Sequence, residues 1–316
     1  MAKNKLYVIG NGFDKHHGLP CGYSDFRAWL QCNRPDVYNN LIRIYGECNS
    51  DWWSKFEESL ACFDPDEYPN EVAETDFFVL KHKLESLYGE EGVAAIDNFE
   101  ENGGDVNNRF RLSEAVAHFE MEKLKDGLNE AFGEWVGTIG VPGQDTAIDG
   151  IDRNAVFFTF NYTKTLEDLY GVDEDMIVHL HGSVDNGVFI IGHGNTLDDM
   201  LENDRENAYQ RDPDADKGGD EARMELFQVI ADELRKPVVA IIEEHKSDFN
   251  ALAGIEEMIV LGFSYSKIDL PYLKRIIEVT GPDIKVEFGY HTPEDQNNAL
   301  ACAAELGLTN WIKMCF

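Results

Sequence analysis

Two segments in the middle of the chain carry side chains suited to binding a sugar or moving a proton. The run Phe158–Thr163 (FTFNYT) ends in an amide and hydroxyls, and Asn161 could hold a ribose hydroxyl or a water molecule. The run His179–Ser183 (HLHGS) carries two histidines that face the same way if the segment is a strand. Because a neutral histidine suits general-base catalysis near pH 7, this run supplies a candidate base.

Both segments also have plainer interpretations. Asn161 could instead cap a helix that starts near Lys164. His181 could be a hydrogen-bonded core histidine that precedes a turn glycine. A metal site is a third interpretation, because His193 places a third histidine within 15 residues of His179. Such a site would need carboxylate support and an open coordination position.

Two glycine turns could contact a nucleotide. The apolar run Leu6–Ile9 breaks on GNGFD (Gly10–Asp14), and glycines let the backbone approach a phosphate that the next helix N-terminus favours. Lys15 stands where the dehydrogenase fingerprint has its third glycine, which counts against an ordinary NAD-dependent dehydrogenase. The run Val260–Ser266 (VLGFSYS) also breaks on glycine, and Ser264 with backbone amides could bind a ribose or phosphate. Simple turns are the alternative for both.

Strand and helix signals alternate along most of the chain. We expect strands at 6–9, 155–160, 177–180, 258–261 and 284–288, with a further short apolar run at 188–191. Helices are expected at about 222–236, after 269 and at 293–306, whereas 237–242 fits either type. This alternation predicts an α/β fold with a doubly wound, mostly parallel, Rossmann-like sheet. The candidate segments then lie at strand ends, where such sheets bind ligands.

Two stretches depart from the alternation. Residues 36–136 show mostly helical spacing, so we expect a helical insertion over 36–150 within a single domain that spans 1–316. Residues 198–221 carry ten acidic residues against three basic ones, which predicts an acidic loop or mobile flap.

Composition excludes several function classes. The net charge of −33 opposes direct binding to nucleic acid or to anionic membranes, since both need clustered Lys and Arg. The sequence has no apolar run of about 18 residues, so no transmembrane helix is expected, and the apolar run after Lys5 is too short for a signal peptide. Six cysteines without C-x-x-C spacing argue against a zinc ribbon. We therefore expect a cytoplasmic protein with reduced thiols.

Taken together, the motifs resemble the AbiH family of bacterial abortive-infection proteins, which act in phage defence. The resemblance rests on GNGFD, HGLP, YSDF, FNYT, HGS and G-x-S blocks, which lie here at Gly10–Asp14, 17–20, Tyr23–Phe26, Phe160–Thr163, His181–Ser183 and Gly262–Ser264. A W-x-x-FE block at Trp53–Glu57 also fits. The resemblance implies an anti-phage effector with a phage-derived trigger, acting as a homo-oligomer or with a partner protein of a defence system.

A more distant resemblance is to sirtuin-like domains. Their G-x-G-x-[ST]-x-x-x-G-[IL]-P spacing is matched from Gly10 to Pro20, and their Phe-Arg pair appears as Phe26-Arg27. The chain departs from that pattern at Asp14, where sirtuins have Ser or Thr, and at Thr163, where they have Asp. It also lacks the Cys₄ spacing of sirtuin deacylases.

The sirtuin-like resemblance implies NAD⁺ as the substrate and hydrolysis of its nicotinamide N-glycosidic bond, with no metal. Asn161 would hold the ribose or the water, and His181 would be the base. The residues implied to bind NAD⁺ are Gly10, Asn11, Gly12, Phe13, Asp14, Arg27, Thr163, Gly262 and Ser264. The alternatives are a non-catalytic nucleotide-binding sensor or regulatory subunit, and a metal-dependent hydrolase using His179, His181 and His193.

Overall fold

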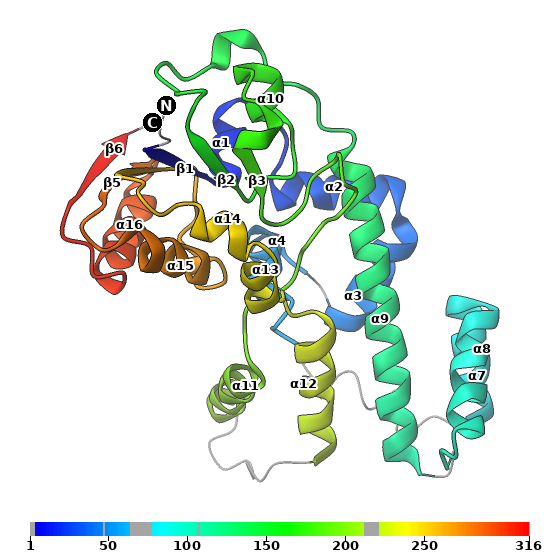
Figure 1. The fold of residues 1–316 in the computed structure, drawn as a ribbon. Coiled ribbons are helices and arrows are strands. Elements are labelled where there is room, and N and C mark those ends of the chain that lie inside the picture. Colours follow the sequence, from blue (N-terminus) through cyan, green and yellow to red (C-terminus); the bar gives the residue numbers. More distant parts are fainter. Residues whose placement is uncertain (1–3, 47, 64–76, 106–107, 212–220, 316) are drawn as a thin grey trace. The chain divides into compact units, whose positions relative to one another are not determined.

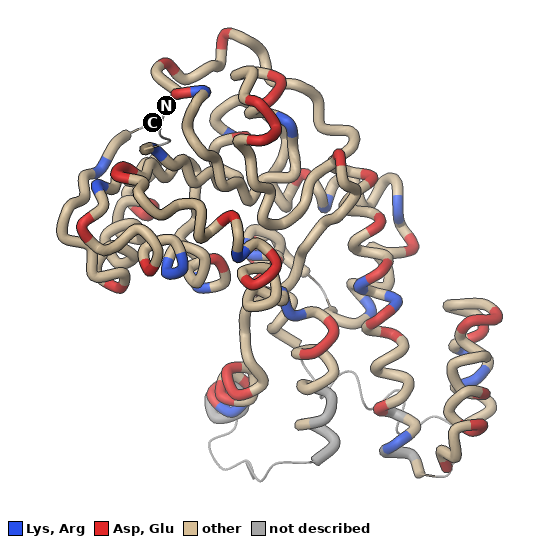
Figure 2. The backbone as a smooth tube through the Cα atoms, viewed as in Figure 1, with Lys and Arg blue, Asp and Glu red and all other residues tan. Residues whose placement is uncertain are grey.

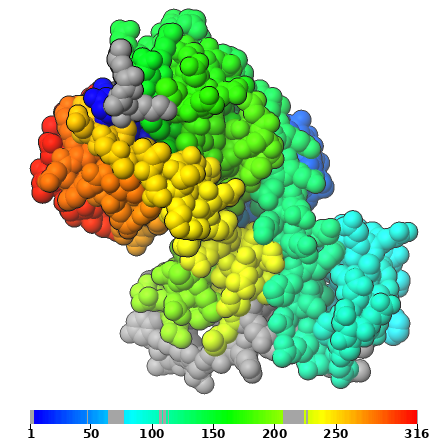
Figure 3. All heavy atoms as spheres, viewed as in Figure 1, coloured from blue at the N-terminus to red at the C-terminus, as the bar shows by residue number. Residues whose placement is uncertain are grey.

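The computed structural model describes residues 4–46, 48–63, 77–105, 108–211 and 221–315 (Figure 1). The chain divides into two compact units. Unit 1 contains Met1–Cys32, Asn129–Ile191 and Lys236–Phe316, and unit 2 contains Asn33–Leu128 and Gly192–Arg235. In unit 1 the green segment and the yellow-to-red segment lie side by side although they are far apart in sequence (Figure 3).

Unit 1 is built on a six-stranded sheet in which every neighbouring pair is parallel. Its order is β3-β2-β1-β4-β5-β6, the Rossmann order, which changes direction between β1 and β4. The predicted doubly wound, Rossmann-like α/β fold is confirmed. The strands are β1 Lys5–Ile9, β2 Val156–Thr159, β3 Ile177–His179, β4 Glu257–Leu261, β5 Lys285–Tyr290 and β6 Trp311–Cys315.

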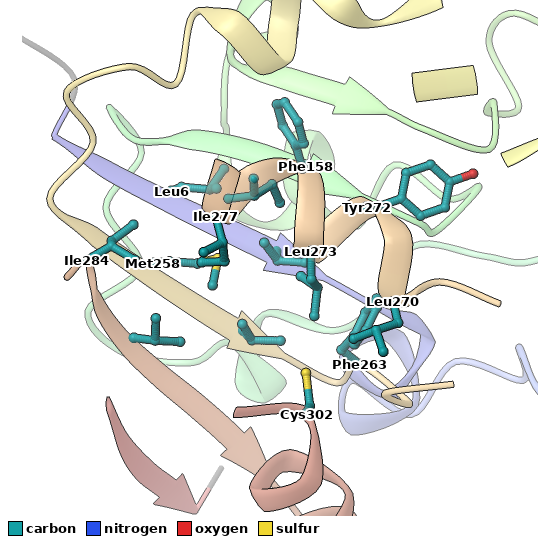
Figure 4. Close-up of a cluster of buried hydrophobic side chains, with 14 of the residues drawn as sticks. Leu6, Phe158, Met258, Phe263, Leu270, Tyr272, Leu273, Ile277, Ile284 and Cys302 are labelled. Atoms are coloured by element: carbon teal, nitrogen blue, oxygen red, sulfur yellow. The ribbon is translucent and has the colours of Figure 1, made fainter. Parts of the chain in front are cut away.

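Helices cover both faces of this sheet. On one face, Leu6, Phe158 and Met258 pack against α13 (Val238–Glu244), α14 (Lys246–Asn250), α15 (Leu270–Thr280) and α16 (Pro293–Glu305), and Figure 4 shows α15 lying across the strands. On the other face, Tyr7 and Phe157 pack against α1 (Asn11–His16) and α10 (Thr165–Tyr170). Burial on both faces explains why the central strands are continuous apolar runs.

Unit 2 is helical in all of its described regular elements. Three of its helices share a core of Leu80, Leu84, Ile96, Leu112 and Val116. The described part of the predicted insertion, 36–150, contains helices and no strand, but residues 129–150 belong to unit 1 and residues 192–235 join unit 2. The remaining helices of the chain are α2 Tyr23–Asn33, α3 Pro35–Tyr45, α4 Ser50–Ser54, α5 Phe56–Ser59, α7 Phe77–Tyr88, α8 Glu90–Glu101, α9 Arg109–Val136, α11 Leu197–Arg211 and α12 Glu221–Glu233, with 3₁₀ turns at Gln144–Thr146 and Glu174–Met176.

The acidic loop or flap predicted at 198–221 is wrong for its first part, because Leu197–Arg211 form helix α11. Thr196 and Asp199 start this helix by exchanging side-chain to backbone hydrogen bonds of 2.7 and 3.2 Å, as in a capping box. Acidic residues in the first turn also suit the helix dipole. Residues 212–220 lie outside the described residues, and Glu221 already belongs to α12.

Three further details differ from the sequence-based expectations. The apolar run 188–191 forms no strand, the undecided segment at 237–242 is largely helix α13, and the edge strand β6 was not expected. Asp and Glu residues occur in both units and are not confined to one segment (Figure 2). None of the described helices combines the length and apolarity that crossing a membrane requires.

Candidate functional site at the carboxyl edge of the sheet

The glycines of the opening motif pack against the backbone of Gly262, at the point between β1 and β4 where the strand order reverses. A Cβ atom on Gly10 would lie 2.6 Å from the carbonyl oxygen of Gly262, and one on Gly12 would lie 2.8 Å from the Gly262 Cα. The Gly10 amide donates to the Leu261 carbonyl and the Gly12 amide to the Gly262 carbonyl, at 2.9 and 2.8 Å. Close packing of two strand ends therefore accounts for these glycines, and neither amide is open to a phosphate in this conformation.

Four other residues predicted to bind NAD⁺ lie near these turns. Three of them make structural contacts, and for the fourth the role in binding stays a prediction. Phe13 is a core residue, because its ring is fully buried beside Tyr170 and its amide donates to the Gly10 carbonyl. The Asn11 side chain donates to the Cys21 carbonyl at 2.9 Å. Ser264 is exposed and accepts from the Ser266 amide, as in a simple turn. Arg27 lies half-buried on α2, and its role in binding stays a prediction.

A buried polar cluster forms where β1 and β2 end. Asp14 is 1% exposed, and its Oδ2 accepts a 2.6 Å hydrogen bond from the Thr163 hydroxyl. Its other oxygen, Oδ1, is buried without a hydrogen-bond partner. Burial raises the pKa of Asp14, although the nearby polar side chains of Thr163, Thr165 and Asn161 act in the opposite direction. The opening motif and the FNYT motif therefore meet in one cluster.

Asn161 has a fixed main chain and an unpartnered side chain. Its main-chain N–H donates to Thr159 Oγ1 at 3.1 Å, and its main-chain carbonyl accepts from His179 Nδ1 at 3.0 Å. The residue is 6% exposed, and both Nδ2 and Oδ1 are buried without a hydrogen bond of ordinary length. The helix-cap interpretation is wrong, since α10 starts at Thr165 and its N-cap is Lys164.

The unpartnered amide is informative because native proteins rarely leave such groups unsatisfied. More than about 90% of buried polar groups have a partner, and each lost one costs about 1–3 kcal/mol. The Asn161 amide and Asp14 Oδ1 together offer one donor group and two acceptor atoms. This set matches a small ligand whose hydroxyls both donate and accept.

Glu167 is a member of this cluster that belongs to none of the motifs selected from the sequence. Its Oε1 lies 3.4 Å from His179 Nε2, and its Oε2 is buried without a partner. Its negative charge also raises the pKa of Asp14. His179 thus links the end of β3 to Asn161 and to α10, which gives it a structural role.

His181 lies at the same sheet edge, surrounded by aromatic rings. Thr159 pairs with His179 across β2 and β3, and Asn161 and His181 each lie two residues beyond that pair. The His181 ring packs on Phe160 with centroids 5.0 Å apart, and its Nε2 is 3.2 Å from the Tyr272 hydroxyl. In the part of the chain that the structure describes, no hydrogen bond joins the side chains of His181 and Asn161, so the two belong to adjacent polar clusters.

Burial keeps His181 uncharged. Desolvation, and then the positive charge of Lys236, hold the pKa of His181 well below its ordinary value of 6.5. The ring is therefore neutral at pH 7, the form that a general base needs, although a low pKa also makes it a weaker base.

The three histidines of the metal interpretation have separate surroundings. His193 belongs to unit 2, where its Nε2 lies 3.3 Å from the Ile230 carbonyl. Among the residues that the structure describes, no group of three or more His, Cys, Asp or Glu side chains has an arrangement that could hold a metal ion.

Comparison with models of known protein families shows the family to which the chain belongs. The model of the family described as bacteriophage abortive infection AbiH matches residues 6–290. The chain belongs to the AbiH family. Family membership implies a role in abortive infection of phage-infected bacteria. No curated protein and no solved structure matches the chain significantly.

The AbiH match covers both polar clusters and five of the six strands. It starts inside β1 and ends with β5, so β6 lies beyond it. Asp14, Asn161 and His181 all fall within the matched range. The sirtuin-like resemblance stays a prediction, because no comparison bears on it.

Proposed function

We propose that this AbiH protein binds NAD⁺ at the carboxyl edge of its sheet and hydrolyses the nicotinamide N-glycosidic bond during phage infection. One observation carries the proposal. The Asn161 amide is buried with both polar atoms unpartnered, next to the unpartnered Oδ1 of Asp14. The cluster lies beside the change of direction between β1 and β4, where sheets of this order bind dinucleotides.

The charge of the cluster favours the ribose over the phosphates. Asp14 is acidic and Glu167 is close enough to raise its pKa, so a phosphate would meet repulsion there. The vicinal hydroxyls of a ribose can instead donate to Asp14 Oδ1 and Asn161 Oδ1, and accept from Asn161 Nδ2. We therefore assign Asp14, Thr163 and Asn161 to the nicotinamide ribose.

The reaction is a hydrolysis that needs no further reactant. The bond from ribose C1′ to the nicotinamide nitrogen breaks, and its electron pair neutralises the positive pyridinium ring. A water oxygen bonds to C1′, and the water proton passes to His181 and then to solvent. The products are nicotinamide, ADP-ribose and a proton. Asn161 would stabilise the oxocarbenium-like transition state by holding the ribose.

Chromatography of NAD⁺ incubated with the purified protein tests this function. The incubation is run with the protein alone and with extract from phage-infected cells, because the proposed reaction takes place during phage infection. Nicotinamide release is expected for the wild type and for His82→Ala, whose side chain is 80% exposed. Asn161→Ala and His181→Ala should each lose release by at least about 100-fold. Variants that cleave as fast as the wild type would refute the assignment.

A second candidate is a sensor that binds the nucleotide without turnover. The low pKa of His181 favours this candidate, because a weak base slows water activation. Calorimetry with NAD⁺ separates the two functions. A sensor would bind NAD⁺ with or without the His181 side chain and would lose binding with Asn161→Ala. It would release no nicotinamide in any extract.

A further inference from the structure

A second buried polar cluster surrounds His181 at the start of α15. The Tyr272 hydroxyl lies 3.2 Å from His181 Nε2, and Asp269 Oδ1 lies 3.8 Å from the same nitrogen. The same Asp269 oxygen is 3.7 Å from the ammonium group of Lys236. Tyr272 is fully buried and Lys236 is 3% exposed. Asp269 is also reached by the Ser266 hydroxyl, at 3.4 Å from Oδ2.

Such a cluster is costly to bury, so a purely structural role is a poor explanation for it. Removing a lysine and a carboxylate from water costs several kcal/mol for each ion, and an apolar pair of the same size is often at least as stable. The surrounding core is apolar and includes Phe160, Phe263 and Leu270. Asp269 instead faces one nitrogen of His181, and Lys236 faces the same oxygen of Asp269.

We propose that Tyr272, Asp269 and Lys236 are positioning residues that hold His181 with a proton on Nε2 and a lone pair on Nδ1. Nε2–H donates to the Tyr272 hydroxyl oxygen, and the nearby Asp269 carboxylate favours a proton on the nitrogen that faces it. When Nδ1 takes a proton from water, Asp269 stabilises the imidazolium, as the buried aspartate of a Ser-His-Asp triad does. Lys236 balances the Asp269 charge before that transfer.

The catalytic part of this inference rests on the proposed function, but the arrangement itself can be measured without NAD⁺. Side-chain ¹⁵N spectra of the full chain, labelled at histidine, report the tautomer of each ring. The His181 signals are identified by their loss in His181→Gln. We expect a protonated Nε2 and an unprotonated Nδ1 at neutral pH. A His181 ring with its proton on Nδ1 would overturn the proposal.

Two variants test which groups set this state. Tyr272→Phe removes one oxygen atom and should shift the Nε2 signal of His181, whereas Asp248→Asn, beside the half-buried His245, should leave it unchanged. Lys236→Met removes a positive charge and should raise the titration midpoint of His181 by about one pH unit. Tyr272→Phe keeps the test valid if Lys236→Met does not fold. An Nε2 signal that ignores Tyr272→Phe would contradict the network.

Activity measurements separate failure of the network from failure of the proposed function. If the wild type hydrolyses NAD⁺, Tyr272→Phe and Asp269→Asn should lower kcat by at least about tenfold, change KM little and move the pH profile. If no condition yields nicotinamide but the tautomer is as expected, the network stands and the hydrolase function fails. If hydrolysis occurs with the opposite tautomer, the network fails alone.

Discussion

Replacing Gly262 by alanine tests whether the glycine motif serves backbone packing. Gly262 has φ +63°, a left-handed conformation that costs a non-glycine residue about 1 kcal/mol. A Cβ atom there would also lie 2.5 Å from the carbonyl carbon of Gly12 and 2.8 Å from its Cα, against an ordinary contact of at least 3.4 Å. Relieving an overlap with backbone atoms costs about 1–3 kcal/mol more. We expect Gly262→Ala to lower the free energy of unfolding by about 2–4 kcal/mol.

Gly307 supplies the matched control. Its φ of +64° is nearly the same, but a Cβ atom there would meet nothing within 4 Å. Gly307→Ala should therefore show only the conformational cost of about 1 kcal/mol. Urea denaturation of both variants, followed by circular dichroism, measures the difference. Equal losses would refute the packing explanation and return the glycines to the role of a phosphate loop.

Two further predictions concern the Asp14 cluster. Thr163→Val removes the 2.6 Å hydrogen bond to Asp14 and should cost about 1–3 kcal/mol in urea denaturation, whereas Thr146→Val, which loses an exposed bond, should cost at most about 0.5 kcal/mol; similar losses would contradict a special role for Thr163. Because burial raises the folded-state pKa of Asp14 above 3.8, its contribution to stability is greatest below that pH and declines as pH rises through the folded-state pKa. The stability of Asp14→Asn relative to wild type should accordingly increase across that window, and a constant difference between pH 4 and 8 would show that the pKa is not raised.

The central strands were predictable because physics leaves few alternatives for them. Runs such as Met258–Leu261 are apolar on both faces and end at glycine, which fits a strand buried between two helical layers. The edge strand β6 could not be predicted in this way. It pairs with β5 alone, and because Ile312 and Lys313 are exposed, its sequence is not a continuous apolar run. The run 188–191 is apolar but serves as a connection in which the Ile190 amide donates to the His181 carbonyl. Apolarity there predicts neither a strand nor full burial, since Val188 is exposed.

The candidate site was predictable only where its residues belong to recognisable motifs. Asp14 and Thr163 stand 149 positions apart, yet each follows a strand that ends at the same edge, so their contact could be anticipated. Lys236 and Tyr272 could not be selected, because an isolated lysine before a helix and a tyrosine in a helix carry no local signal. The packing of α15 against the sheet brings Tyr272 to His181, and Lys236, just before α13, reaches Asp269 beside that ring.

The structure also divides the opening motif into two parts with different purposes. Gly10 and Gly12 face Gly262 and use their amides on that segment, which fixes how the ends of β1 and β4 meet. Asp14, one turn later, turns its carboxylate toward Thr163 and Asn161. A mutation in the first part should therefore disturb folding before chemistry. A mutation of Asp14 should remove an acceptor from the proposed ribose site while the ends of β1 and β4 still meet. The Asp14 carboxylate, and not the glycines, therefore links the opening motif to the proposed activity.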